Sequence, residues 1–208
     1  VEEAVASGCD DILIITGRNK RAIEDHFDVS AELNMHLQNS GNTELLEASE
    51  RLSDLADIHY IRQKEQRGLG DAVLCAKQHV GDEPFAVLLG DTICLPDKGE
   101  KPCTAQLAEM LVKYQQPVIG VEVVPEHKIK DYGIIDGKLI EDRVYQILDI
   151  IEKPSPEEAP SNIGAMGRYV LTSEIFEILE HTAPGRKGEI QLTDALSKYT
   201  DYLGVIAK

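Results

Sequence analysis

The sequence lacks features that define several large classes of protein. It has no apolar run near the roughly 20 residues of a membrane span, and its first residues lack the basic and apolar regions of a signal peptide. We therefore expect a cytoplasmic protein without a membrane partner. Basic residues are few, since 21 Lys and Arg oppose 37 Asp and Glu, for a formal net charge of -16. Nucleic acids are bound by clustered Lys and Arg, so this balance argues against them but allows a small phosphate ligand.

The sequence also has few residue patterns that would indicate cysteine chemistry or covalent catalysis. Cys9, Cys75, Cys94 and Cys103 form no C-x-x-C pair and have no His at zinc-site spacing. We favour reduced, mostly buried thiols over a metal or redox role. No Ser-His-Asp, Cys-His or H-E-x-x-H arrangement is found either, so the sequence gives no sign of a protein nucleophile.

Strands and helices alternate over the first part of the 208-residue chain. After a helix end that Gly8 terminates, apolar runs predict strands over 11–16, 58–62, 85–89 and 117–124. Helical spacing predicts helices over 20–27, 71–79 and 104–114, and a helical hairpin over 30–57 that breaks at Ser40-Gly41-Asn42. This order predicts an α/β fold with right-handed crossovers and a mostly parallel sheet.

The pattern changes after Pro125 to shorter segments joined by turns. Two β-rich segments cover 132–140 and 144–152, and Asp136-Gly137 is a hairpin signal, so a small antiparallel addition is expected. Helices over 173–181 and 189–199 and a strand over 202–208 follow. We see no linker long enough to split the chain, and we predict one domain over 1–208.

Asp91 ends the apolar strand in Leu88-Leu-Gly-Asp91. Ligands of open α/β sheets gather beyond the carboxyl ends of the strands, so this carboxylate could hold a metal-bound phosphate. Mg²⁺ prefers such oxygen ligands and shares them with substrate phosphates. An Asp that merely caps the strand end is an equally good interpretation of this spacing.

A second candidate lies between a strand and a helix, in Arg62-Gln-Lys-Glu-Gln-Arg-Gly-Leu-Gly-Asp-Ala-Val73. The glycines of this loop allow backbone to approach a ring or phosphate, and Gln63 offers a donor and an acceptor for the edge of a base. The loop is neither a Walker A motif nor G-x-G-x-x-G. A simple tight turn is the favoured alternative.

The third candidate is the pair Glu152 and Lys153, which Pro154 follows at the end of another apolar run. The carboxylate could bind sugar hydroxyls and the ammonium could bind a phosphate. Without further context, an exposed ion pair is the simpler interpretation.

Taken together, these motifs resemble those of the UTP-glucose-1-phosphate uridylyltransferases, within the sugar nucleotidyltransferase family of bacterial and archaeal type. The resemblance covers essentially the whole chain. Gly90-Asp91 and Glu152-Lys153-Pro154 are shared with sugar nucleotidyltransferases generally, whereas the last motif is more specific. The motifs are R-Q-x(4)-G-L-G-D-A-V over 62–73, G-D over 90–91, E-K-P over 152–154, N-x-G-x-x-G-R-Y-V-L over 162–171 and G-E-I-Q-L-T-D-A-L over 188–196.

The resemblance implies a three-layer α/β/α Rossmann-like nucleotidyltransferase fold and a Mg²⁺-dependent transfer between UTP and glucose 1-phosphate that yields UDP-glucose and pyrophosphate. It further implies that Gln63 and the backbone of Gly68 read uracil, that Asp91 binds Mg²⁺, and that Asp91 and Lys153 are catalytic. Gly133 would meet the sugar, Glu152 its hydroxyls and Lys153 its phosphate. The segment 188–196 would support the site, without a catalytic role for Asp194.

Two motifs of the family are not found in this sequence: an opening glycine-rich G-x-G-T-R loop with a nearby Lys, and an Asp beyond the last strand. We therefore expect a fragment truncated at both ends, with little or no activity of its own. Three alternatives remain: a non-catalytic sugar-nucleotide-binding regulatory subunit, a thymidylyl or adenylyl homologue, and, ranked low, a glycosyltransferase. The last would commonly carry Asp-x-Asp, whereas Thr92-Ile93 follows Asp91. We also expect a homo-oligomer, with the hairpin over 30–57 as a possible subunit contact.

Overall fold

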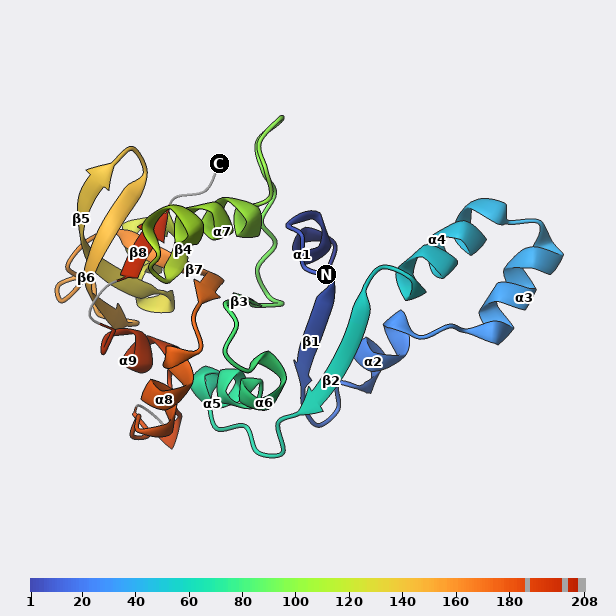
Figure 1. Ribbon diagram of the computed structural model, residues 1–208, viewed down its shortest axis with the longest axis horizontal. Coiled ribbons are helices and arrows are strands. Elements are labelled where there is room, and N and C mark those ends of the chain that lie inside the picture. The colour runs from blue at the N-terminus through green and yellow to red at the C-terminus, as the bar shows by residue number, and fades with distance from the viewer. Residues whose placement is uncertain (186–187, 200–201, 206–208) are drawn as a thin grey trace. The chain divides into compact units, whose positions relative to one another are not determined.

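The computed structural model describes residues 1–185, 188–199 and 202–205. The chain forms two compact units, Val1–Glu65 and Gln66–Lys208 (Figure 1). The single domain expected over 1–208 stays a prediction. Within the described ranges, every helix is too short or too polar to cross a bilayer.

The first unit contains a pair of parallel strands and a set of helices. β1 and β2 pair in register from Asp11 opposite Asp57 to Thr16 opposite Arg62, as expected for the strands of a parallel sheet. Its elements are, in chain order, α1 (Glu2–Ala6), β1 (Asp11–Thr16), α2 (Arg21–Phe27), α3 (Ala31–Ser40), α4 (Thr43–Ser53) and β2 (Asp57–Arg62).

Helices α3 and α4 form the expected helical hairpin. Gly41 ends α3 in the left-handed conformation, with a φ of 70° that glycine adopts without strain. Asn42 then caps α4, because its side-chain oxygen accepts a hydrogen bond from the backbone N–H of Leu45 at 3.4 Å. Between the helices, Ser49 Oγ donates to Asn34 Oδ1 at 3.0 Å. The predicted break at Ser40-Gly41-Asn42 is confirmed.

The second unit is built on a six-stranded sheet in the order β3-β7-β4-β8-β6-β5. β4 and β8 pair in parallel, whereas β7 runs against β3 and β4, and β6 runs against β8 and β5. The elements are α5 (Leu69–Leu74), α6 (Lys77–Val80), β3 (Phe85–Leu88), α7 (Cys103–Tyr114), β4 (Val118–Val123), the 3₁₀ helix η1 (Glu126–Asp131), β5 (Gly133–Glu141), β6 (Val144–Glu152), β7 (Ile163–Leu171), α8 (Glu174–Glu180), α9 (Leu192–Leu196) and β8 (Tyr202–Val205).

Helices cover both faces of this sheet (Figure 1). On one face, Tyr169 and Leu171 of β7 pack in a core cluster with residues of α5, α8 and α9. On the other face, Val170 packs with Cys103 and Leu107 of α7. Successive residues of one strand thus face different helical layers, as the alternation of side chains along a strand requires. The expected three-layer α/β/α fold is confirmed, although its sheet is more mixed than expected.

β7 is a strand that the sequence did not predict, although it lies inside the sheet. It pairs with β3 and β4, and Gly164 pairs in addition with Ile134 of β5. Gly164 and Gly167 interrupt the apolar pattern that would have marked a strand. Both glycines have a physical reason: a Cβ on Gly164 would lie 2.6 Å from Val124 Cγ2, and Gly167, at a bulge in β7, has a φ of 80°.

The antiparallel addition is confirmed as the β5–β6 hairpin, but its expected turn at Asp136-Gly137 is wrong. Those residues lie inside β5, where the register shifts between them. A Cβ on Gly137 would come within 3.3 Å of the backbone oxygen of Gln146, so the glycine permits a bulge instead of a turn. The turn itself lies at Asp142 and Arg143, and Arg143 has a φ of 61°.

Three further elements differ from expectation in extent. The helix expected over 71–79 is divided into α5 and α6, because the chain tightens at Ala76, whose N–H donates to Val73 O at 2.9 Å. The helix expected over 189–199 is limited to α9, and β8 begins at Tyr202 as expected. Residues 206–208 of the expected final strand lie outside the described residues.

The cysteines are all thiols, but the expectation that most are buried is wrong. Cys103 is buried, whereas Cys9, Cys75 and Cys94 are half-buried. Burial, followed by the charge of Asp10, raises the pKa of the Cys9 thiol, which keeps it protonated and unreactive at neutral pH.

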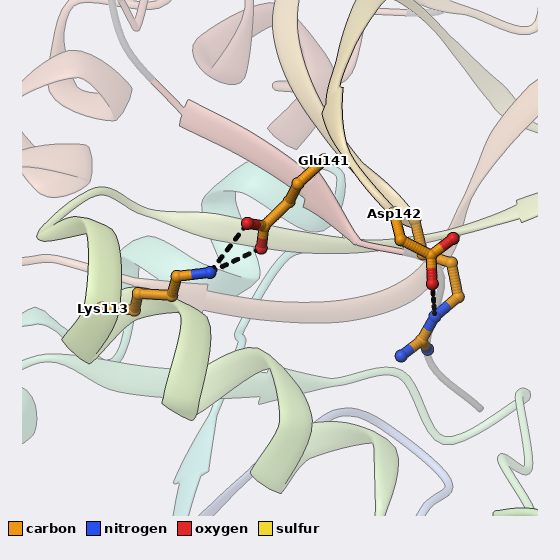
Figure 2. Close-up of polar contacts among 4 residues, drawn as sticks. Lys113, Glu141 and Asp142 are labelled. Atoms are coloured by element: carbon orange, nitrogen blue, oxygen red, sulfur yellow. Dashed lines mark hydrogen bonds and ion pairs between the residues drawn. The ribbon is translucent and has the colours of Figure 1, made fainter.

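An ion pair joins α7 to the turn end of the β5–β6 hairpin. Figure 2 shows Lys113 Nζ facing both oxygens of Glu141, at 2.6 and 2.8 Å. This hydrogen bond is the largest cause of the raised pKa of Lys113 and of the lowered pKa of Glu141. Beside it, Arg143 Nε lies 3.6 Å from Asp142 Oδ2. The pair therefore anchors the hairpin at the end opposite Glu152.

Candidate functional site

Asp91 lies on a tight turn directly beyond β3. The N–H of Leu89 donates to Gly167 O at 3.0 Å, so the pairing between β3 and β7 continues into this turn. Asp91 itself is exposed. Arg168 holds the turn by donating from its guanidinium to Leu89 O at 3.1 Å and to Thr92 O at 2.8 Å. The carboxylate is therefore presented to solvent by a backbone that is fixed on both sides.

Glu152 and Lys153 lie where β6 ends, and Glu152 pairs with Gly133 at the start of β5. The Glu152 carboxylate is held at both oxygens: Oε2 accepts from Thr193 Oγ1 at 2.9 Å, and Oε1 lies 3.5 Å from Lys153 Nζ. The side chain of Lys153 is 51% exposed. A fixed carboxylate and a solvent-accessible ammonium group are thus brought together at one end of the hairpin.

Gly133 belongs to the same group because no larger residue fits beside Glu152. A Cβ at this position would lie 2.9 Å from Thr193 Cγ2 and 3.4 Å from Glu152 Oε2. The structure therefore brings together Gly133, Glu152 and Lys153, which are the three residues expected at the sugar phosphate.

Tyr169 is a buried residue of the same unit on which the charges of Glu152 and Asp91 both act. It lies in β7, opposite Val87 of β3 and Ile119 of β4. Burial raises the pKa of the Tyr169 phenol, and the charges of Glu152 and then Asp91 raise it further. The Tyr169 hydroxyl therefore stays protonated at neutral pH.

The loop that contains Gly68 is held by the segment before α9. The N–H of Gly70 donates to Ile190 O at 2.9 Å, and the N–H of Ile190 donates to Arg67 O at 2.7 Å. Gly68 has a φ of 103°, and a Cβ there would lie 2.6 Å from Ile190 O. Only glycine fits this close approach of two backbones. The segment 188–196 thus contacts both the loop, through Ile190, and Glu152, through Thr193.

Gln63 is described with the first unit, where it follows β2. Its backbone N–H donates to Thr16 O at 2.9 Å and so extends the pairing of β1 and β2. Gly133, Glu152 and Lys153, and the turn that carries Asp91, belong to the second unit.

Sequence reasoning did not select Arg168, Tyr169 or Thr193 as functional candidates. Arg168 and Tyr169 lie in the strand that was not predicted, and Thr193 contacts a residue 41 positions away in the chain. The family-like motifs over 162–171 and 188–196 were the signal that could have pointed to them, since all three residues lie inside those motifs.

The Asp91 carboxylate fits a hard divalent cation. It is exposed and offers oxygen donors, which such ions prefer to nitrogen or sulfur. Few protein ligands are enough when phosphate oxygens of a substrate complete the coordination.

Comparison with protein families gives a match to the nucleotidyl transferase family over residues 1–205. The chain belongs to this family. We therefore interpret three features as parts of a nucleotidyl transferase: the exposed Asp91, the Glu152-Lys153 pair and the glycine loop at Gly68.

Two curated relatives of this nucleotidyl transferase are named for the same activity. The chain is 56% identical over 196 residues to the UTP–glucose-1-phosphate uridylyltransferase YngB of Bacillus subtilis strain 168, covering 94% of this chain and 65% of that protein. It is 53% identical over 207 residues to a second UTP–glucose-1-phosphate uridylyltransferase of the same strain, covering 100% of this chain and 70% of that protein. The chain thus spans about two thirds of the length of these relatives.

Solved structures with the same fold carry names of the same kind. A UDP-glucose pyrophosphorylase complexed with UDP-glucose superposes with a TM-score of 0.90 at 38% identity, covering 100% of this chain and 76% of that chain. A UTP-bound UGPase from Acinetobacter baumannii superposes with a TM-score of 0.86 at 33% identity, covering 99% of this chain and 72% of that chain. The Rossmann-like nucleotidyltransferase fold implied by the sequence is confirmed.

Proposed function

We propose that the full-length protein transfers the uridylyl group of UTP to glucose 1-phosphate and releases pyrophosphate. The names of relatives at 53 to 56% identity support this activity. Within the chain, the observation that carries the proposal is the group of Gly133, Glu152 and Lys153 around one end of the hairpin, with Asp91 exposed on the turn beyond β3 in the same unit.

In this proposal, Lys153 and Glu152 bind the acceptor sugar. The ammonium group of Lys153 pairs with the phosphate of glucose 1-phosphate, and the Glu152 carboxylate accepts hydrogen bonds from the sugar hydroxyls. Gly133 meets the sugar in this proposal, and its lack of a side chain lets Thr193 approach Glu152 closely. The acceptor is thereby held by its charge at one end and by its hydroxyls at the other.

Gln63 and Gly68 bind the uracil of UTP in this proposal, through the side-chain amide of Gln63 and the backbone of Gly68. Paired hydrogen bonds discriminate strongly between bases, since a wrong base leaves buried polar groups without partners. Asp91 holds Mg²⁺, which, when bound, offsets the negative charge of the phosphates.

The reaction then needs positioning and charge, without a protein nucleophile. A phosphate oxygen of glucose 1-phosphate forms a bond to the α-phosphorus of UTP, and the bond from that phosphorus to pyrophosphate breaks in line. Lys153 would lower the repulsion between the two anions by pairing with the sugar phosphate, and Asp91 would lower it through the Mg²⁺ that it would hold at the phosphates of UTP.

We also propose that the protein acts in the cytoplasm and as a homo-oligomer. The oligomer is supported by apolar side chains that α3 and α4 expose, since Leu33, Met35 and Leu45 are 47, 61 and 54% exposed. Light scattering of the full-length protein in solution measures its mass, and a monomer at all concentrations would contradict this part of the proposal.

The proposed activity is tested by pyrophosphate release from the full-length protein, with each of the four nucleoside triphosphates and several sugar 1-phosphates. We expect UTP with glucose 1-phosphate to be the fastest pair and Mg²⁺ to be required. A preference for dTTP or ATP would favour a thymidylyl or adenylyl transferase. Binding of UDP-glucose without turnover of any pair would favour a regulatory subunit.

A further inference from the structure

Arg168 is a buried cation that none of the roles above explains. It is 4% exposed and lies in β7, next to Tyr169. Taking a guanidinium group out of water is costly unless its N–H groups are satisfied. A buried arginine at this place therefore calls for a specific use of its hydrogen bonds.

Those hydrogen bonds converge on the turn that carries Asp91. Nη1 donates to Leu89 O at 3.1 Å and to Gly167 O at 3.4 Å, and Nη2 donates to Thr92 O at 2.8 Å. Leu89 and Thr92 are the residues on either side of Gly90-Asp91. One guanidinium thus ties the entry and the exit of this turn to each other and to β7.

The shape of the side chain matters for this contact. A guanidinium is planar and rigid, so two of its nitrogens fix two carbonyl groups at a set separation, whereas the ammonium of a lysine is a single point. Gly90 gives the turn no side-chain contacts of its own, since a Cβ there would meet nothing within 4 Å. Packing at Gly90 therefore does little to hold the turn, and the hydrogen bonds of Arg168 add to the backbone hydrogen bond from Thr92 N–H to Leu89 O at 3.4 Å.

We propose that Arg168 is a positioning residue that fixes the Asp91 carboxylate in the place where it holds a divalent cation. The inference rests on the proposed function, because it assigns to Arg168 a role in that same site. Arg168 donates to the backbone carbonyl groups on either side of Gly90-Asp91, so it acts on the metal through the position of Asp91. Loss of such outer partners of a metal ligand typically weakens metal binding by about 10- to 100-fold.

The test uses the full-length protein with two substitutions, Arg168→Lys and Arg168→Met. Arg168→Lys keeps the charge and the aliphatic stem but loses the planar guanidinium that donates to two carbonyl groups. Thermal unfolding shows whether each variant is folded. Mn²⁺ serves as a paramagnetic probe, and its affinity is measured by electron paramagnetic resonance with UDP-glucose present. We expect both variants to bind Mn²⁺ about 10-fold more weakly or worse, with an equal rise in the Mg²⁺ concentration for half-maximal rate and little change in KM for glucose 1-phosphate.

The decisive comparison introduces Arg168→Lys into both the wild-type protein and the Asp91→Ala variant. This comparison does not need Arg168→Met, so it remains possible if that variant fails to fold. If Arg168 acts through Asp91, Arg168→Lys weakens Mn²⁺ binding in the wild-type protein but adds nothing in Asp91→Ala. Equal losses in both backgrounds, or unchanged Mn²⁺ affinity in a folded Arg168→Lys, would overturn the inference while leaving the proposed function intact. A wild-type protein that binds Mn²⁺ but forms no UDP-glucose would instead contradict the proposed function.

Discussion

At the scale of single residues, Glu152 illustrates how a carboxylate is prepared for a ligand. Thr193 holds one oxygen at 2.9 Å, and Lys153 lies 3.5 Å from the other. Thr193 is 6% exposed, so water competes little for the hydrogen bond between its hydroxyl and Glu152. The side chain of Glu152 is therefore held in one orientation by its neighbours.

Replacing Thr193 tests that orientation. Thr193→Val keeps the shape of the side chain but removes the donor, and we expect KM for glucose 1-phosphate to rise about tenfold, since a hydrogen bond to a charged group contributes about 1.5–3 kcal/mol. Steady-state kinetics of the full-length protein measures the effect, and Thr193→Ser, which retains a hydroxyl, is the matched control. Equal KM values for the valine and wild-type proteins would show that Glu152 needs no such support.

Residues at strand ends could be found from the sequence, whereas their partners could not. Asp91, Glu152 and Lys153 each follow an apolar run, and in open α/β sheets ligands generally gather beyond such strand ends. Thr193 and Arg168 act through contacts that depend on the three-dimensional register of other elements. The sequence around Thr193 and Arg168 has no apolar periodicity or charge pattern that would predict those contacts.

At the scale of elements, most helices and strands follow from apolar period and capping residues. The first unit is the clearest case, since β1 spans 11–16 as expected and the hairpin breaks at Gly41. β7 was missed and the β5–β6 turn misplaced for a shared reason. Glycines that allow close packing or a bulge, such as Gly164 and Gly137, cannot be distinguished in the sequence from glycines that make turns.

The ion pair of Figure 2 gives a prediction for the stability of the hairpin. The hydrogen bond from Lys113 lowers the pKa of Glu141 below its ordinary value of 4.5. A carboxyl group with a lowered pKa in the folded state adds stability above its unfolded pKa, and this stability is lost as the pH falls through the folded pKa. We expect Glu141→Gln to lower the unfolding midpoint slightly at neutral pH and to converge with wild type in acid.

Urea unfolding at a series of pH values measures this difference. Asp142→Asn is the control, because Asp142 is adjacent, exposed and outside the contact with Lys113. Turnover should be unchanged in Glu141→Gln, since the pair lies at the far end of the hairpin from Glu152. A midpoint difference that is constant from neutral to acid pH would show that the pair contributes no charge-dependent stability.

At the scale of the whole molecule, the acidic surface and the proposed substrates are compatible because the site supplies its own positive charge. The chain carries a formal net charge of -16, yet Lys153 presents its ammonium group where the sugar phosphate is expected. The family could be inferred from the sequence because its motifs follow one another from residue 62 to residue 196. The grouping of the chain into two compact units could not, since no change of composition or linker marks residues 65 and 66.

The central claim is that Asp91 and Lys153 act in one site on two anionic substrates, and turnover of single variants tests it most directly. UDP-glucose formation is measured for the full-length wild type, for Asp91→Ala and for Lys153→Ala, with Asp97→Ala and Lys98→Ala as controls of equal charge change on the exposed loop that follows β3. The account predicts that each site variant loses at least about 100-fold in turnover, as expected when charge stabilisation is removed, while both controls stay near wild type. Near-normal turnover in Asp91→Ala and Lys153→Ala would contradict it.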